Sequence, residues 1–344
     1  MLAIVQTSLV ARRTRNSDAA ALLESFLVSA VVSFLAIRAF LAATGYPRIG
    51  GGGLHIAHML WGGLLMLVAL GMLLVFLDRW TQHVAAIVAG LGFGTFIDEI
   101  GKFLTADNNY YFQPAVALVY VIFVTLFLVG RAVIGNRPLS PRERLANALD
   151  LLEQHLDRPI EPDERAHIAA LLPRDGPDAP FAADVRRYVD GLPSAENRDT
   201  WLEALPARIT RAYVRLAANA SFDRAVVVVV VLYAVAAVAG VLALAIATGS
   251  AGSSDAWTVS RVGSGLSTLV GAGLVARGVL ALRGSRAGAY HWFLRGLLVW
   301  ILVTQVFVFY ASQLAGLGGL VVDLVAYASL RMALRSEIRI GGAT

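Results

Sequence analysis

The sequence predicts an all-α polytopic integral membrane protein, and three observations lead to this fold class. The chain has 344 residues, of which 57% are hydrophobic and 15% charged, and its mean hydropathy is +0.66. Apolar runs of about 18 residues or more recur along it, and each is long enough to cross roughly 30 Å of hydrocarbon. Arginine residues are concentrated in every other connection between these runs. This combination is typical of helices that cross a membrane repeatedly, not of a soluble domain.

Hydropathy predicts eight transmembrane helices, at 22–44, 54–77, 84–104, 113–135, 224–248, 258–280, 291–313 and 315–334. They group into five regions: an N-terminal segment at 1–21, a first half at 22–136, a polar helical insert at 137–223, a second half at 224–335 and a tail at 336–344. The halves suggest a 4+4 parallel repeat, because Gly63 precedes His83 by the same spacing as Gly271 precedes His291.

The positions of the basic residues predict the topology. They lie before the first helix, between the second and third, between the sixth and seventh, at both ends of the insert, and at the C-terminal end. These residues are Arg12, Arg13, Arg15, Arg79, Arg131, Arg137, Arg208, Arg211, Arg215, Arg224, Arg283, Arg286, Arg331, Arg335 and Arg339. The opposite loops carry only Arg48 and Lys102. The positive-inside rule therefore predicts a multi-pass protein of the cell membrane with both termini cytoplasmic.

The insert is polar and rich in proline. Ser140-Pro141-Arg142-Glu143 is a capping box with proline at the first helical position, and it predicts a helix that runs to about Asp157. EPDERAHIAALL and APFAADVRRYVDGL predict two further short helices, and a fourth is expected from about Ser194. His155 and His167 are expected to be solvated. We expect this cytoplasmic insert to serve a protein partner or contacts in a homo-oligomer.

Composition excludes several kinds of chemistry. The chain has no cysteine, so disulfides, thiolate metal sites and cysteine nucleophiles are excluded. Its pI near 9.7 reflects arginines beside the membrane spans. We therefore expect the lipid bilayer, and no nucleic acid, as the partner of this charge.

The stretch DEIGKFLTADNN at 98–109 concentrates polarity in an apolar chain. At 1.5 Å per residue, the predicted topology brings ionisable side chains from three consecutive helices to one depth of the outer leaflet. These candidate site residues are Arg38, His55, His58, Asp98, Glu99 and Lys102, with Asp107 in the loop above. Ionised groups inside a span are costly, which makes them functional candidates.

Helical phase predicts how the acids are oriented. Small residues repeat every four positions before Asp98, at Ala86, Gly90 and Gly94, and such a stripe allows close helix packing. Asp98 should therefore face protein and not lipid. Glu99 is turned about 100° from it, so the two acids are not expected to face one neighbour.

Three interpretations of this cluster remain open. The first is a structural network that pairs Arg38 with Asp98 and Lys102 with Glu99. The second is a divalent metal site, such as zinc, held by His55, His58 and Asp98. The third is a pocket for a polar solute or lipid head group, in which the charges act as ligands or proton carriers.

The functional hypothesis is an outward-facing polar site in a transporter-like or ligand- or cation-binding membrane protein. The alternative is a membrane-embedded metal-dependent hydrolase or lipid-modifying enzyme, in which Glu99 would be the base. A separate acid, Asp323, lies near the middle of the last predicted helix. It is expected to pair with Arg277 or Arg295.

Overall fold

The computed structural model of this chain describes residues 14–44, 58–104, 114–135, 137–155, 159–176, 178–194, 220–250 and 258–341. This part of the chain is helical, and it contains 7 helices long and apolar enough to cross a membrane. The chain divides into two compact units. Unit one comprises 1–104 and 125–198, and unit two comprises 105–124 and 199–344. The predictions for His55, Asp107 and the helix after Ser194 lie outside the described residues.

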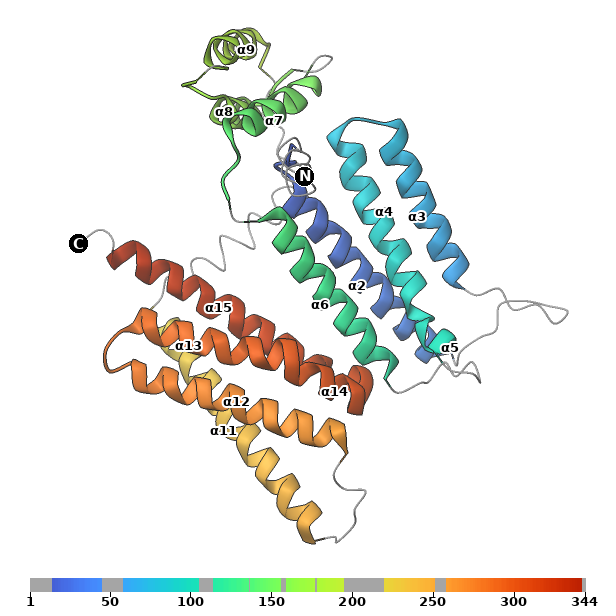
Figure 1. The fold of residues 1–344 in the computed structure, drawn as a ribbon, viewed down its shortest axis with the longest axis vertical. Helices are drawn as coiled ribbons and strands as arrows, with labels where there is room; N and C mark the ends of the chain where they lie inside the picture. The colour runs from blue at the N-terminus through green and yellow to red at the C-terminus, as the bar shows by residue number, and fades with distance from the viewer. Residues whose placement is uncertain are drawn as a thin grey trace, which may run out of the picture. The chain divides into compact units, whose positions relative to one another are not determined.

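Three long helices form the membrane part of unit one. They are α2 (Ala19–Thr44), α3 (His58–Val75) and α4 (Arg79–Asp98). Figure 1 shows α4 between the other two, and α4 packs against both of them. The polar residues Ser33, Arg38 and Asp98 face this packing and are buried. Most exposed side chains of α3 are large and apolar, as a lipid-facing surface requires.

Glycines explain how closely these helices approach. A Cβ on Gly90 or Gly94 would overlap the backbone carbonyl of Phe26 or Ala30 on α2. On the other side of α4, a Cβ on Gly92 would meet the backbone of α3. The small-residue stripe that precedes Asp98 therefore packs against protein, as predicted, and it brings α2 into backbone contact with α4.

The backbone leaves regular helical geometry at the acidic pair Asp98 and Glu99. α4 ends at Asp98, and Glu99 follows with φ −83° and ψ 2°, outside regular helical geometry. The short helix α5 (Ile100–Leu104) then begins. α6 (Ala115–Ile134) follows and is divided between the units after residue 124.

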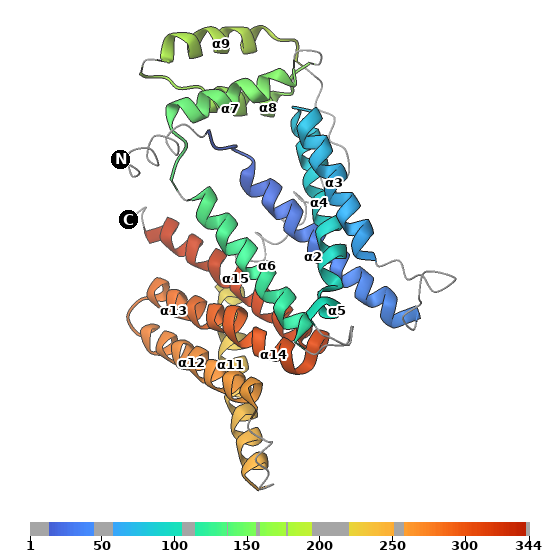
Figure 2. The same ribbon diagram turned by 45° about the vertical axis from the view of Figure 1, so that its right-hand side comes forward.

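Residues 141–191 form three shorter helices around a small core. They are α7 (Pro141–Glu153), α8 (Pro162–Leu171) and α9 (Ala179–Gly191), shown together in Figure 2. The predicted capping box is confirmed, because Ser140 and Glu143 exchange side-chain to backbone hydrogen bonds. Apolar side chains from all three helices meet inside: Leu145, Ala148, Ile160, Ile168, Leu172, Ala182, Val185 and Val189.

One expectation for this region is wrong. His155 is buried, with its Nε2 3.4 Å from Glu164, because the chain folds back after α7 and places the ring against the start of α8. His167 is exposed, as predicted.

A polar joint connects α7 to the segment before α2 and to the start of α4. Arg15 donates to the Glu143 carboxylate at 3.0 Å. Asn147 accepts from the Ser17 amide at 2.7 Å. Arg79 pairs with Asp18 at 2.5 Å and with Asp150 at 2.7 Å. These residues lie at the end of the unit opposite the last turn of α2 and the first turn of α3.

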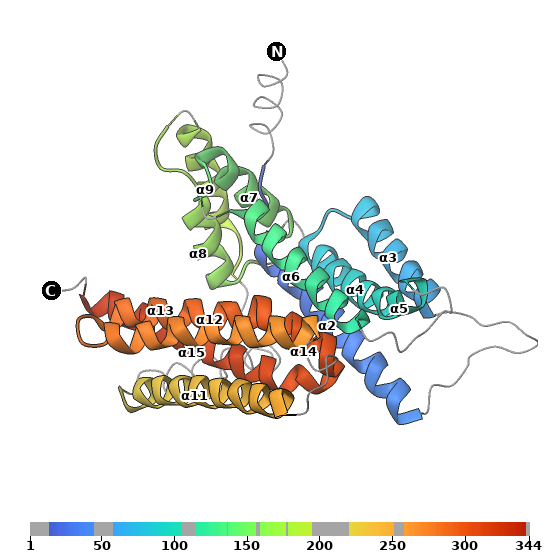
Figure 3. The same ribbon diagram turned by 60° about the horizontal axis from the view of Figure 1, so that its bottom comes forward.

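Unit two contains the last helical segments of the chain. They are α11 (Ala220–Ser250), α12 (Val259–Ala281), α13 (Arg286–Val299), the π-helical turn η2 (Trp300–Thr304), α14 (Gln305–Ser312), the 3₁₀ turn η3 (Gln313–Gly316) and α15 (Leu317–Gly341). α13 packs between α12 and α15, and α11 contacts both α12 and α15 (Figure 3). Phe293, Leu297 and Leu330 are fully buried in the core of this unit.

The seventh candidate span, Arg286–Leu334, has 49 residues and covers two of the predicted helices. It is not straight, because the backbone reverses after Ser312. Gln313 adopts φ 48°, an uncommon conformation for a residue other than glycine. The Gln305 side chain donates to the Gly316 carbonyl at 2.9 Å and closes the turn. α15 then packs back along α13.

Packing does not support the proposed repeat. A Cβ on Gly271 would overlap the Trp300 ring, whereas a Cβ on Gly63 would meet nothing within 4 Å. The two glycines therefore occupy different environments. Glycine is required at position 271 because the Trp300 indole occupies the space of a side chain there. At position 63, no described residue lies close enough to require glycine.

Candidate functional site

A network of five ionisable side chains lies at the end of unit one opposite the joint. α2 contributes Arg38 from its last turns, and α3 contributes His58 as its first residue. Asp98, Glu99 and Lys102 come from the break between α4 and α5. The structure thus brings together all the candidate residues that it describes. We call these five residues the ionic network.

Asp98 is the buried centre of the network, with 0% of its surface exposed. One of its carboxylate oxygens pairs with Arg38 Nε. The other lies 3.1 Å from His58 Nε2. Arg38 also donates to the Asp98 carbonyl at 3.1 Å and lies over the Phe34 ring. These contacts fix the ion pair between α2 and α4 that the structural interpretation predicts.

Glu99 is 1% exposed and has equally specific partners. One oxygen pairs with Lys102, which is the second predicted ion pair. The other accepts the backbone N–H of Met59 at 3.0 Å. This amide belongs to the first turn of α3, where N–H groups have no helical acceptor and the helix dipole favours negative charge. The sequence carries no side-chain signal for this contact.

His58 lies between the two acids. Its Nε2 is 3.1 Å from Asp98 and its Nδ1 is 3.8 Å from Glu99. The expectation that Asp98 and Glu99 cannot face one neighbour is therefore wrong. The 100° separation holds only within a continuous helix, and α4 ends between these two residues.

Within the network, Arg38 and both acids are buried, and His58 and Lys102 are partly exposed. The carboxylates are buried at 0% and 1%, whereas the side chains of His58 and Lys102 are 24% and 23% exposed. Two acids face Arg38 and Lys102, so the formal charges balance while His58 is neutral.

The predicted metal site remains a prediction. It requires His55, His58 and Asp98, and His55 lies outside the described residues, as does Asp107. Within the ranges that the structure describes, no three His, Cys, Asp or Glu side chains are placed to hold a metal ion.

In unit two the predicted partner of Asp323 is wrong. The guanidinium groups of Arg277 and Arg295 lie 4.4 and 4.7 Å from the centre of the Trp292 ring. Asp323 is 2% exposed and makes no ion pair with any described residue. Both arginines lie over one indole, and Asp323 lines a cavity instead.

Comparisons of this chain with protein-family models, with characterised proteins and with solved structures gave no match. Its repeated long apolar helices are those of a polytopic membrane protein.

Proposed function

We propose that this chain is a transporter-like protein of the cell membrane whose ionic network binds an anionic group beside His58 and Lys102. The observation that carries this proposal is the exposure of the network: both acids and Arg38 are buried, whereas His58 and Lys102 border the surface. A solute that approaches the network meets His58 and Lys102 before it meets either carboxylate.

The charge balance supports an anion as the ligand. Arg38 and Lys102 formally balance Asp98 and Glu99, and all the carboxylate oxygens have partners. An arriving anion can therefore accept hydrogen bonds from the exposed nitrogen groups of His58 and Lys102. Arg38 and Lys102 would hold the two acids in place throughout.

The same geometry disfavours a cation as the ligand. A cation would have to displace Arg38 or Lys102 from the buried acids, and these bases would repel it. The anionic group can be a free anion, such as phosphate, or the phosphate of a lipid head group. Both share the same chemistry, and an experiment must separate them.

The membrane arrangement is part of the proposal. We infer that Arg286–Leu334 crosses twice, because its backbone reverses at Gln313, which gives eight crossings in total. Both termini and the insert at 137–223 then lie in the cytoplasm, and the ionic network faces outward. The insert would remain available for a protein partner or a second copy of the chain.

The test is anion binding by the full chain in nanodiscs, followed through Trp61. This residue lies one turn after His58 and is 58% exposed. In phosphatidylcholine discs, we expect saturable binding of inorganic phosphate. In discs that contain phosphatidylglycerol, loss of phosphate binding would identify the lipid head group as the occupant.

The matched variants are His58→Gln and His83→Gln. His58→Gln should weaken phosphate binding about tenfold, equivalent to about 1.4 kcal/mol. His83→Gln should leave phosphate binding intact, because His83 lies at the opposite end of α4, beside the Arg79 carbonyl. Absence of saturable phosphate binding, or unchanged binding in His58→Gln, would overturn the proposal. Stoichiometric zinc that is lost in His58→Ala would instead favour the metal-dependent enzyme.

A further inference from the structure

A second site lies in unit two, around Asp323. The carboxyl group borders a cavity of about 280 Å³ between α11, η2, α14 and α15. The cavity adjoins the π-helical turn Trp300–Thr304, and such turns occur frequently at functional sites. Asp323 is 2% exposed, and its Oδ1 has no hydrogen-bond partner. A buried acid with an unpaired oxygen is costly unless a further group supplies a donor.

Three of the side chains that line this cavity donate to other acceptors. The hydrogen bonds run from Trp300 Nε1 to the Thr268 carbonyl at 3.2 Å, from Gln305 Nε2 to the Gly316 carbonyl at 2.9 Å, and from Thr304 Oγ1 to Ser267 Oγ at 2.9 Å. The Tyr233 hydroxyl is within hydrogen-bonding reach of Asp323 and supplies one donor. The second oxygen therefore calls for a donor that does not come from these side chains.

Aromatic rings make this cavity suited to an organic cation. Tyr233 and Trp300 both line it, and their rings meet edge to face with centroids 5.2 Å apart. Aromatic faces attract ammonium groups, most strongly where water is excluded. A single carboxylate beside two aromatic rings matches one positive charge, whereas a hard metal ion requires six or more oxygen ligands.

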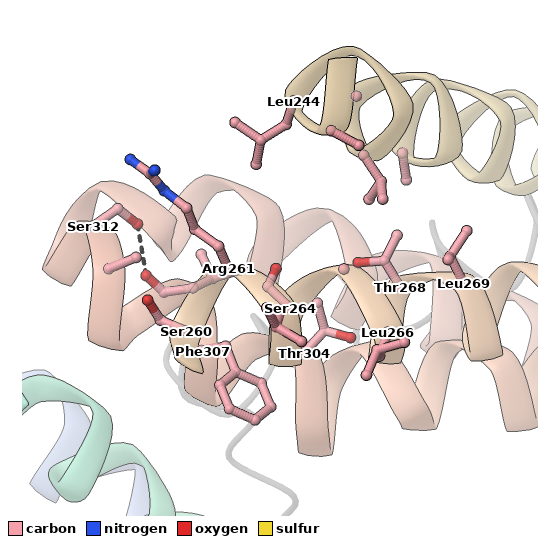
Figure 4. A pocket seen from close by; sticks show the side chains of 18 of the residues that line it. Leu244, Ser260, Arg261, Ser264, Leu266, Thr268, Leu269, Thr304, Phe307 and Ser312 are labelled. Carbon is pink, nitrogen blue, oxygen red and sulfur yellow. Dashed lines mark hydrogen bonds between the residues drawn. The ribbon is translucent and has the colours of Figure 1, made fainter. Parts of the chain in front are cut away.

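An apolar cleft adjoins the Asp323 cavity. It has a volume of about 560 Å³ and lies between α11, α12 and α14. Figure 4 shows Leu244 across the cleft from Ser264 and Thr304, with Arg261 at one end. The same side chains of Tyr233, Thr268 and Thr304 line both spaces. A molecule bound at Asp323 can therefore extend into apolar surroundings.

We propose that unit two binds a lipophilic amine, with its ammonium group on Asp323 and its hydrocarbon body in the apolar cleft. The amine donates to Asp323 Oδ1 and lies against Tyr233 and Trp300. Arg261, at one end of the cleft, disfavours a second positive charge on the ligand. This site is in the other unit from the ionic network and does not depend on the function proposed for His58.

The experiment measures binding of tritiated octylamine to the full chain in nanodiscs at pH 7, with octanol and octanoate as competitors. We expect saturable binding that octanol, of equal chain length but uncharged, displaces at least tenfold less well than unlabelled octylamine. Asp323→Asn should weaken amine binding about tenfold or more, and Asp323→Glu should retain it. Asp184→Asn, an exposed acid on α9, is the matched control and should bind like the parent.

The comparison of amine with alcohol uses the parent protein, so it decides the proposal even if Asp323→Asn does not fold. Equal displacement by octanol would show that the cleft recognises only the hydrocarbon. Full binding by a folded Asp323→Asn variant would show that the acid is not the receptor. Displacement by sodium chloride, but not by N-methylglucamine chloride of equal strength, would indicate an inorganic cation site. Each of these three results would overturn the proposal.

Discussion

At the scale of single residues, each buried carboxylate of the ionic network has two partners. Asp98 has an arginine and a histidine, and Glu99 has a lysine and a backbone amide. The net gain from a buried ion pair is small, because desolvation offsets the attraction. Removal of one partner is different, because it leaves the other charge buried and unpaired.

Asp98→Asn should therefore lower the free energy of unfolding by about 3–5 kcal/mol, since it leaves Arg38 without its anion. Chemical unfolding of the full chain in detergent micelles measures this loss. The control is Asp184→Asn, which breaks an exposed pair with Arg187 and should cost less than about 1 kcal/mol. Similar losses in both variants would contradict the central role of the buried pair.

At the scale of elements, contact between α2, α3 and α4 depends on glycine. The carbonyl oxygens of α2 lie where the Cβ atoms of Gly90 and Gly94 would be. This backbone contact sets the distance over which Arg38 reaches Asp98. Helix packing and the ionic network are thus consequences of the same small residues.

Gly94→Ala should force α2 and α4 apart and destabilise the protein by about 1–3 kcal/mol, the usual cost of overpacking. Gly71→Ala on α3 is the matched control, because a Cβ there meets nothing within 4 Å. It should be neutral or slightly stabilising, since alanine favours helix more than glycine does. Thermal unfolding of both variants in the same micelles tests the difference. If Gly71→Ala were as harmful as Gly94→Ala, close packing at Gly94 would not be the cause.

At the scale of the whole molecule, unit one joins its membrane helices to the α7–α9 region through charge. Arg15 and the Ser140 amide donate to Glu143 and lower the pKa of this carboxyl group from 4.5 to about 2. A lowered pKa in the folded protein means that ionised Glu143 stabilises the joint above about pH 4.5. That contribution is lost as the pH falls from 4.5 towards 2.

Hydrogen exchange in α7 tests this pH dependence. After correction for intrinsic exchange rates, amides in the first turns of α7 should lose protection between pH 4.5 and 2 in the parent. Glu143→Gln should show reduced protection even at pH 6, with a smaller change on acidification. Glu153→Gln, at an exposed position of the same helix, should follow the parent. A Glu143→Gln profile identical to the parent would rule out control by this carboxylate.

The accuracy of prediction also differs with scale. The helices, the capping box at Ser140 and the protein-facing stripe before Asp98 were all predictable, because each depends on a local pattern. The pairing of Arg38 with Asp98 followed from depth in the membrane. The contact from Met59, the burial of His155 and the cavity at Asp323 were not predictable. Each depends on where the chain breaks a helix or reverses, and no local pattern marked those points.

The sequence by itself determined that this is a helical membrane protein, because apolar length and arginine placement are properties of the chain alone. Only the tertiary structure decided that His58 lies between two acids and that Asp323 faces a cavity instead of an arginine. The break in α4 at Glu99 and the reversal at Gln313 set these directions. Such turns arise from the packing of distant segments, so their effect on side-chain direction appears only when the helices are assembled.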